Sequence, residues 1–231
     1  MKKKCMAALI LTAAMAVQPV CAFGASSSMS TDGGSVTTSG SSGGSSHSSS
    51  KSTVSVSSTG VKTTGATTSK NSNGSLIGVA VNTTTTKGEP VTVNARGEAV
   101  IGNTAVSFAE GTKAATAGLP DTVVAAINGI NGGKSLSEVV KDVDLAGFHA
   151  LTGTHAILTK DASNGSVKTG EVEVSLYVPN LVEGLADLSV LFYDNAKGTW
   201  QLLPAVKIDP VTKSVAVNIP GSGTLSVVYK K

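Results

Sequence analysis

Two histidines, His149 and His155, are the residues of this chain best suited to acid–base chemistry or metal binding. Asp144 and Asp161 lie near them in sequence, so a metal site or a histidine base with a carboxylate partner is one reading. However, a spacing of six residues does not place two rings on one helical face, and no third ligand is marked by its spacing. The pattern favours two ordinary, partly buried histidines, and we predict neither a metal nor another cofactor.

The segment Gly129–Ser135, with the sequence GINGGKS, is the nearest match to a phosphate-binding loop. Such a loop has glycine at the position of Asn128, and it follows a buried strand so that backbone N–H groups point at the phosphate. The residues before Gly129 instead have helical periodicity. The segment therefore predicts a turn that ends a helix.

Two carboxylates, Glu171 and Glu173, have the residue types of a glycosidase pair. On a strand, residues two apart share one face, and a solvated polar face explains the pair more simply. We therefore predict no catalytic residue here.

Aromatic side chains offer a second kind of site, because Tyr193 and Trp200, together with Tyr177, could stack on a sugar or a peptide. Trp200 follows the glycine of a predicted hairpin by two residues, a position that is typical of a ring covering a core. Tyr193 and Trp200 are the only binding residues that the sequence suggests.

The elements that would position these residues are clearest between Glu171 and Lys230. Apolar and polar residues alternate there, as in EVEVSLYVP, which predicts half-buried β-strands. Turn signals at residues 194–198, 209–213 and 220–223 separate the strands. This succession predicts an antiparallel meander.

Helical periodicity interrupts the strands in the first half of the domain. Apolar residues at helical spacing predict a helix over residues 119–130, which Gly132 and Gly133 end. Ser135 and Glu138 form a capping-box pattern, which predicts a second helix over residues 136–141. Strands are expected at Leu76–Val81, Pro90–Asn94, Glu98–Ile101 and Ala105–Phe108, with a further strand that ends at Leu158.

The segments VSLYVPNL and YDNAKGTWQLLPAVKIDPVTKSVAVNIPGSGTLSVVYK resemble the C-terminal β-domains of uncharacterised secreted proteins from anaerobic gut-type bacteria. In those domains a strand ends in Tyr-Asp, a Gly-x-Trp begins the next strand, and a glycine-rich turn precedes the final strand. The resemblance covers about the last third of the chain. It implies export and a β-sandwich-like module, and it carries no activity.

The first 22 residues have the three parts of a secretory signal: three lysines, an apolar centre and a short polar exit, with cleavage expected between Ala22 and Phe23. Cleavage there removes both cysteines, Cys5 and Cys21. It also leaves fifteen basic and fifteen acidic residues, which gives no reason to expect nucleic acid as a partner. No later segment has the length of a membrane span.

Residues 23–74 are dominated by serine, threonine and glycine, which cannot offset the entropy of ordering, so we expect a flexible tail or linker. Apolar content rises at Ser75, and residues 75–231 are enough for one folded domain. We expect a mainly β domain, an antiparallel, immunoglobulin-like β-sandwich with one or two short helices.

The function expected from these features is that of an exported, non-enzymatic structural or interaction module at a cell surface or in an extracellular matrix. The alternatives are a module that binds carbohydrate or peptide, and a secreted hydrolase. The hydrolase would need His149 or His155 within hydrogen-bond reach of a carboxylate or serine in a cleft. Cell-wall or extracellular polysaccharides and proteins are the expected partners.

Overall fold

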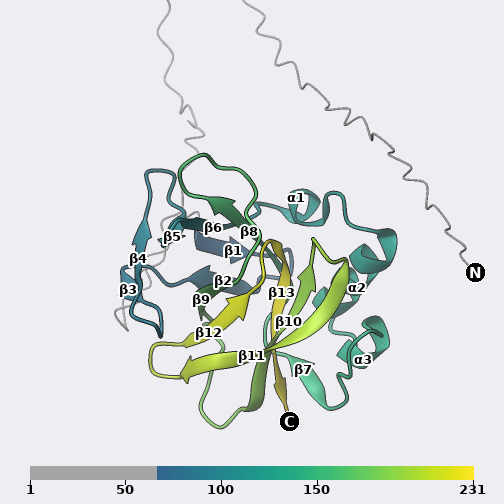
Figure 1. Cartoon of the computed structure of the whole chain (residues 1–231). Coiled ribbons are helices and arrows are strands. Elements are labelled where there is room, and N and C mark those ends of the chain that lie inside the picture. The colour runs from purple at the N-terminus through teal and green to yellow at the C-terminus, as the bar shows by residue number, and fades with distance from the viewer. Residues whose placement is uncertain (1–66) are drawn as a thin grey trace, which may run out of the picture. The chain divides into compact units, whose positions relative to one another are not determined.

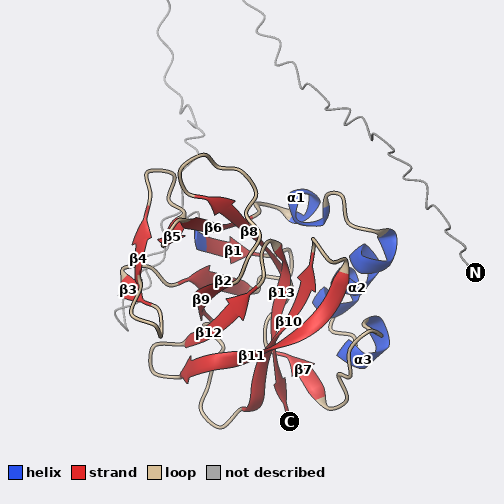
Figure 2. Cartoon of the chain, in the orientation of Figure 1, coloured by secondary structure: helices blue, strands red, loops and turns tan. Residues whose placement is uncertain are grey.

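A single long strand, β11 (Thr199–Asp209), joins the two halves of one strongly curled antiparallel sheet (Figure 1). The computed structural model describes residues 67–231, and the predicted signal peptide and most of the predicted linker lie outside this range. The described part contains thirteen strands and three helices (Figure 2). The other elements are β1 (Thr68–Lys70), β2 (Leu76–Val79), β3 (Thr83–Thr84), β4 (Pro90–Val93), β5 (Ala99–Ile101), β6 (Thr104–Phe108), α1 (Thr112–Thr116), α2 (Asp121–Asn131), α3 (Leu136–Val139), β7 (Phe148–Ala150), β8 (His155–Asp161), β9 (Val172–Tyr177), β10 (Ala186–Asp194), β12 (Ser214–Ile219) and β13 (Gly223–Lys230).

Twelve strands lie across the sheet in the order β1-β2-β9-β12-β11-β10-β13-β8-β6-β5-β4-β3, and β7 pairs with β13 outside this path. β2 stands near one end of this order and β3 at the other, yet they are neighbours in the chain. Residues 80–82 connect them, and Asn82 has a left-handed φ of 57° at this bend. The chain itself therefore links the two far sides of the curled sheet.

The prediction of a two-sheet sandwich is wrong, because β11 runs through both halves without a break. β10 pairs with β11 from Thr199 to Pro204, and β12 pairs with β11 from Ala205 to Asp209 on the opposite edge. A register shift between Ala205 and Lys207 marks an irregularity in this second pairing, the kind of feature that bends a strand. A proline such as Pro204 usually marks the end of a strand. Here it is the last residue of β11 that pairs with β10, so its missing N–H is tolerated. The prediction of a mainly β, antiparallel fold with short helices is confirmed.

The predicted meander is confirmed for β10, β11 and β12 but not for β9 or β13, since β9 pairs with β2 and β12 rather than with β10. β13 pairs with β10, β8 and β7, not with the preceding β12. The segment Pro220–Gly223 is therefore a crossover rather than a hairpin turn. Gly223 is required there, because a Cβ atom would lie 2.2 Å from the Tyr193 carbonyl oxygen.

The inner side of the curled sheet holds the main apolar core. Alternate residues of β9 and β12 point into it, and Phe192, Ile157 and Leu181 have no exposed surface. Buried residues of nine strands and of the loops after β2 and β9 fill this space, which is why the strand pattern alternates so regularly.

Helices α2 and α3 cover the outer side of β10, β11 and β13 (Figure 2). Val123, Ile127 and Ile130 of α2 pack there against a second apolar cluster, together with Leu136 of α3. This confirms the helical periodicity that the sequence shows at residues 119–130. None of the helices within residues 67–231 is long and apolar enough to cross a membrane.

The GINGGKS segment ends α2, as predicted. Asn131 is the last residue of the helix, and Gly133 has a left-handed φ of 77°. Gly129 lies within the helix, where a Cβ atom would lie 2.5 Å from a methyl group of Val139 in α3. Its small size therefore serves the close packing of α2 against α3.

The predicted second helix is present as α3, but it ends at Val139 and its capping box does not form. Ser135 makes no side-chain cap, and its hydroxyl instead lies 3.0 Å from the hydroxyl of Ser137. Four further elements, β1, β3, β7 and α1, have too short or too polar a pattern to be predicted. β1 precedes Ser75, where the composition shifts, and pairs with β2 from Thr68 to Lys70.

The hairpin turns are built on aspartates, in agreement with the turn signals. Asp161, Asp194 and Asp209 each accept hydrogen bonds from the backbone N–H groups two and three residues later, at 2.9–3.2 Å. The residue four positions after each aspartate has a left-handed φ: Gly165 (75°), Gly198 (68°) and Lys213 (57°).

We expect Asp194→Ala to lower the free energy of unfolding by about 1–2 kcal/mol, because the N–H groups of Ala196 and Lys197 lose a buried carboxylate acceptor. Asp194→Asn keeps an acceptor oxygen and is the matched control. Chemical denaturation of both variants is the measurement. Equal losses in the two variants would show that the charge of Asp194, not its hydrogen bonds, stabilises the turn.

Candidate functional site

His155 lies on the inner side of the sheet, where its ring joins three segments. Its Nδ1 lies 2.9 Å from the Ser69 hydroxyl of β1, and its Nε2 lies 3.3 Å from the Ser75 hydroxyl. Ser75 also accepts a hydrogen bond from the N–H of Gly153 at 2.9 Å. His155 is 2% exposed and lies beside a cleft of about 250 Å³ between β1, α1 and α2.

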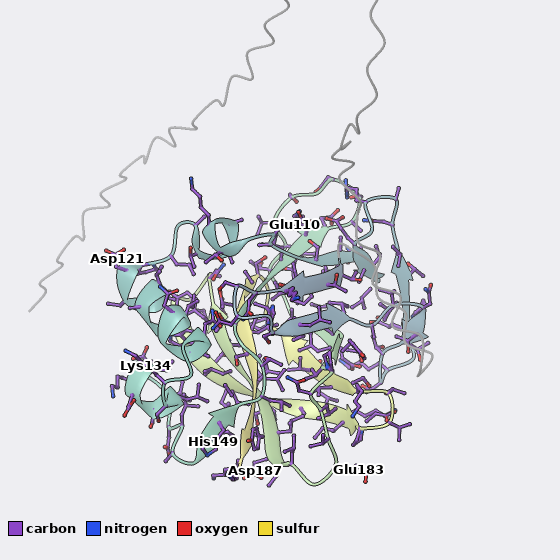
Figure 3. The ribbon with its side chains drawn as sticks, turned by 180° about the vertical axis from the view of Figure 1, so that it is seen from behind. Glu110, Asp121, Lys134, His149, Glu183 and Asp187 are labelled. Carbon is purple, nitrogen blue, oxygen red and sulfur yellow. The ribbon has the colours of Figure 1, made fainter. Side chains whose placement is uncertain are left out.

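His149 does not join this cluster. It is exposed on β7, at the periphery of the folded part (Figure 3), and its ring lies 5.8 Å from that of Tyr229. The sheet register places His149 opposite Tyr229 and His155 opposite Leu225, four residues apart on β13. Four residues of a strand span about 13 Å, so the two histidines do not form one site.

The Ser69–His155 pair meets the geometric condition set for a hydrolase, but its electrostatics oppose base catalysis. Both ring nitrogens of His155 contact hydroxyl groups, whereas a catalytic histidine is usually oriented by a carboxylate that stabilises the imidazolium. Burial lowers the pKa of His155 to about 4, so the ring is neutral and a weak base near pH 7. The contacts suit a structural fastening of β1 to β8.

The aromatic pair Tyr193 and Trp200 is brought together, but inside the protein. The two rings pack 5.3 Å apart at an angle of 57°, under the helices. Tyr193 is 4% exposed and Trp200 is 7% exposed, so neither ring provides an open shelf for a sugar. Tyr177 is also buried. Carbohydrate binding by stacking on this pair has no support in the structure.

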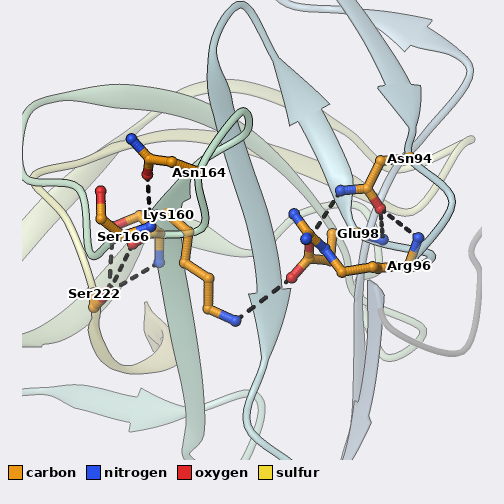
Figure 4. Close-up of polar contacts among 8 residues, drawn as sticks. Asn94, Arg96, Glu98, Lys160, Asn164, Ser166 and Ser222 are labelled. Atoms are coloured by element: carbon orange, nitrogen blue, oxygen red, sulfur yellow. Dashed lines mark hydrogen bonds and ion pairs between the residues drawn. The ribbon is translucent and has the colours of Figure 1, made fainter.

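Two cations and an amide surround the buried carboxylate of Glu98, next to β5 (Figure 4). Its carboxylate accepts hydrogen bonds from Asn94 at 2.8 Å and from Arg96 at 3.0 Å, and the Lys160 ammonium lies 3.5 Å away. The hydrogen bond from Asn94 is the main reason that the pKa of Glu98 is lowered. These groups satisfy one another, which is typical of a structural cluster.

The outer side of β9 and β12 carries two polar hollows, on either side of Glu173. The predicted solvated face is only half right, because Glu171 is exposed whereas Glu173 is buried. The Glu173 carboxylate accepts hydrogen bonds from the N–H and the hydroxyl of Thr86, both at 2.5 Å. This contact fastens the loop between β3 and β4 across the sheet.

The first of these, the Asn218 hollow, has a volume of about 290 Å³. Its lining is mostly polar or charged, with two apolar residues and with glycine at two positions. It consists of Lys87, Glu89, Ile101, Gly102, Asn103, Thr104, Lys168, Thr169, Gly170, Glu171, Val172, Glu173 and Asn218. The second, the threonine hollow, measures about 320 Å³ and is lined by Thr83–Thr86, Thr212 and Ser214 together with Lys207 and Asp209.

Asn218 differs from the other described residues that line these hollows, because it has a buried side-chain atom without a hydrogen-bond partner. Its Oδ1 atom is buried and has no hydrogen-bond partner. Asn218 lies opposite Glu173 in the sheet, and its neighbours Val217 and Ile219 point into the core. An unpaired buried carbonyl costs about 1–3 kcal/mol, so a ligand that donates a hydrogen bond here would recover that free energy.

The sequence could not identify this hollow. Asn218 occupies a polar position in an alternating strand, which predicts only that its side chain faces away from the core. Its neighbours in the hollow come from four separate stretches of the chain, around residues 87–89, 101–104, 168–173 and 218. Among residues 67–231, no group of three or more His, Cys, Asp or Glu side chains is placed to hold a metal ion.

The pH dependence of stability tests the role of His155. The unfolded chain binds the His155 proton near pH 6.5, whereas the folded chain binds it near pH 4. The contribution of His155 to the free energy of unfolding is therefore fully present above about pH 6.5. It falls by roughly 3 kcal/mol as the pH drops toward 4. We expect His155→Gln to remove this part of the loss when unfolding free energies are measured between pH 7 and 4.

His149→Gln is the control, because it removes a histidine that is exposed rather than buried. It should keep the loss seen in the wild type. An identical pH profile for the wild type and His155→Gln would contradict a buried, neutral His155.

Comparison with known proteins adds no family to this picture. Neither a scan of protein-family models nor searches of curated proteins and of solved structures finds a match to this chain.

Proposed function

We propose that this protein is an exported, non-enzymatic interaction module that binds a neutral glycan of a cell wall or extracellular matrix in the Asn218 hollow. The observation that carries the proposal is the buried, unpartnered Oδ1 of Asn218 in a polar hollow. An acceptor in that position requires a donor, and sugar hydroxyl groups are donors that are also uncharged.

The size and lining of the hollow suit a small polar unit. About 290 Å³ is close to the lower end of the range for ligand pockets, roughly 300 Å³. Thr104, Thr169 and Asn103 supply hydrogen-bonding groups beside Asn218, and Glu171 supplies a carboxylate acceptor. A single sugar unit of a longer chain fits this chemistry, with the rest of the chain outside the hollow.

The charges around the hollow favour a neutral ligand. Lys87 and Lys168 stand against Glu89, Glu171 and Glu173, so neither sign dominates strongly. An anionic polymer would meet the three carboxylates, and a cationic one would meet the two lysines.

The sequence features of the first 74 residues support the extracellular setting. The signal-like start implies export, and the segment 23–74 would then carry the domain as a spacer. The resemblance of the C-terminal third to domains of secreted bacterial proteins supports the same setting.

Co-sedimentation tests this function. The chain from Phe23 to Lys231 would be mixed with intact cell walls and with insoluble neutral polysaccharides. We expect it to pellet with at least one of them, and we expect Asn218→Leu to reduce the bound fraction about tenfold or more, because the replacement removes the acceptor. Since that acceptor is unpaired in the free protein, Asn218→Leu should not lower thermal stability.

Gln201→Leu is the matched control. Gln201 also carries a buried, unpartnered amide atom, Nε2, but it lies opposite Phe192 and so faces the inside of the sheet. The Gln201→Leu variant should bind the polysaccharide as the wild type does. Failure of the wild type to pellet with any neutral polysaccharide, or equal binding by Asn218→Leu, would count against a glycan site in the Asn218 hollow.

A further inference from the structure

Exposed apolar side chains gather around the hairpin between β11 and β12. The described residues contain five large apolar side chains with high exposure, and four of them lie here: Val206 (48%), Ile208 (44%), Val211 (71%) and Val182 (51%). Val182 belongs to this group because Leu181, its neighbour, accepts a hydrogen bond from the Lys213 ammonium at 2.6 Å. Large exposed apolar patches mark interfaces for other proteins, and these side chains lie on one hairpin and on the loop bonded to it.

The same place has an open strand edge. β10 pairs with β11 only as far as Pro204, and residues 205–209 are paired with β12 on the opposite edge. Within residues 67–231 no other strand pairs with residues 205–209, and no backbone hydrogen bond joins the loop after β9 to them. A row of backbone donors and acceptors beside apolar side chains is a template for another strand.

The charges on this edge identify a partner strand. Lys207 and Asp209 stand on either side of Ile208, and both line the outer, threonine hollow. If a second copy of β11 lies antiparallel and is centred on Ile208, each Lys207 faces the Asp209 of the other copy. Among the described residues, Lys207 has no ion-pair partner within 4.0 Å in its own chain.

We propose that two copies of this chain associate through β11, edge to edge and antiparallel, with Ile208 on the twofold axis. The pairing places Ile208 against Ile208 of the partner and forms two Lys207–Asp209 contacts. The two sheets then become continuous across the interface. Shifting the register by one residue would place Lys207 opposite the partner's Ile208 and lose both ion pairs, so the charges specify one register.

Sedimentation velocity of the chain from Phe23 to Lys231 tests this inference. At about 100 μM we expect a dimer, and we expect Lys207→Glu to weaken it about tenfold or more, because each Glu would face the Asp209 of the partner. Asp209→Lys should do the same by placing two lysines opposite one another. A mixture of the two variants should form a heterodimer, in which every pair is again of opposite charge.

Two controls separate association from folding. Asp209→Asn keeps the acceptor for the N–H groups of Val211 and Thr212 and removes only the charge, so it should weaken the dimer less than Asp209→Lys does. Val167→Lys changes an apolar side chain that is 77% exposed on another hairpin, and it should leave the dimer intact.

Ile208→Asn should be monomeric while it keeps the wild-type fold by circular dichroism. The proposal is overturned if the wild type is monomeric at about 100 μM, or if Lys207→Glu and Ile208→Asn both dimerise as the wild type does. It is also overturned if the mixture of folded Lys207→Glu and Asp209→Lys stays monomeric. Glycan binding is measured separately, so that either proposal can fail alone.

Discussion

The pairing of β11 with different strands on its two edges is the constraint on which the rest of this fold depends. Along β11, pairing with β10 ends at Pro204 and pairing with β12 begins at Ala205, so one strand serves both halves of the curled sheet. Curling encloses the alternate residues of β9, β10, β12 and β13 in one core. It also divides the outer side into a part that α2 and α3 cover and a part that carries the polar hollows.

Local chemistry is what the sequence predicts well. The aspartate turns at Asp194 and Asp209 form as expected, because the side chain bonds to backbone groups two and three residues away. The helix over residues 121–131 and its glycine end also follow from nearby residues. In each case the interaction that decides the structure lies within one turn of the chain.

Contacts between distant residues decide the features that the sequence does not predict. His155 is fastened by Ser69, 86 residues away, and Glu173 is fastened by Thr86, 87 residues away. Neither partner is marked by any spacing. The continuation of β11 through Pro204 also depends on distant contacts. A proline predicts the end of a strand unless the pairing of its neighbours is known. The sandwich prediction was wrong because contacts between distant residues decide how the strands pair. The sequence does not identify the Asn218 hollow, because its lining also comes from distant segments.

The presence or absence of hydrogen-bond partners distinguishes the structural polar contacts of this protein from the proposed binding site. His155, Glu98 and Glu173 are buried, and each is satisfied by specific partners, so their contacts explain stability without a ligand. Asn218 and Gln201 are different, because each keeps a buried amide atom unpaired at a cost of about 1–3 kcal/mol. The amide of Gln201 lies on the inner side of the sheet, opposite Phe192, and lines neither of the two polar hollows. Asn218 lies beside an open hollow, where under the proposed function a ligand that donates a hydrogen bond would recover this cost as binding free energy.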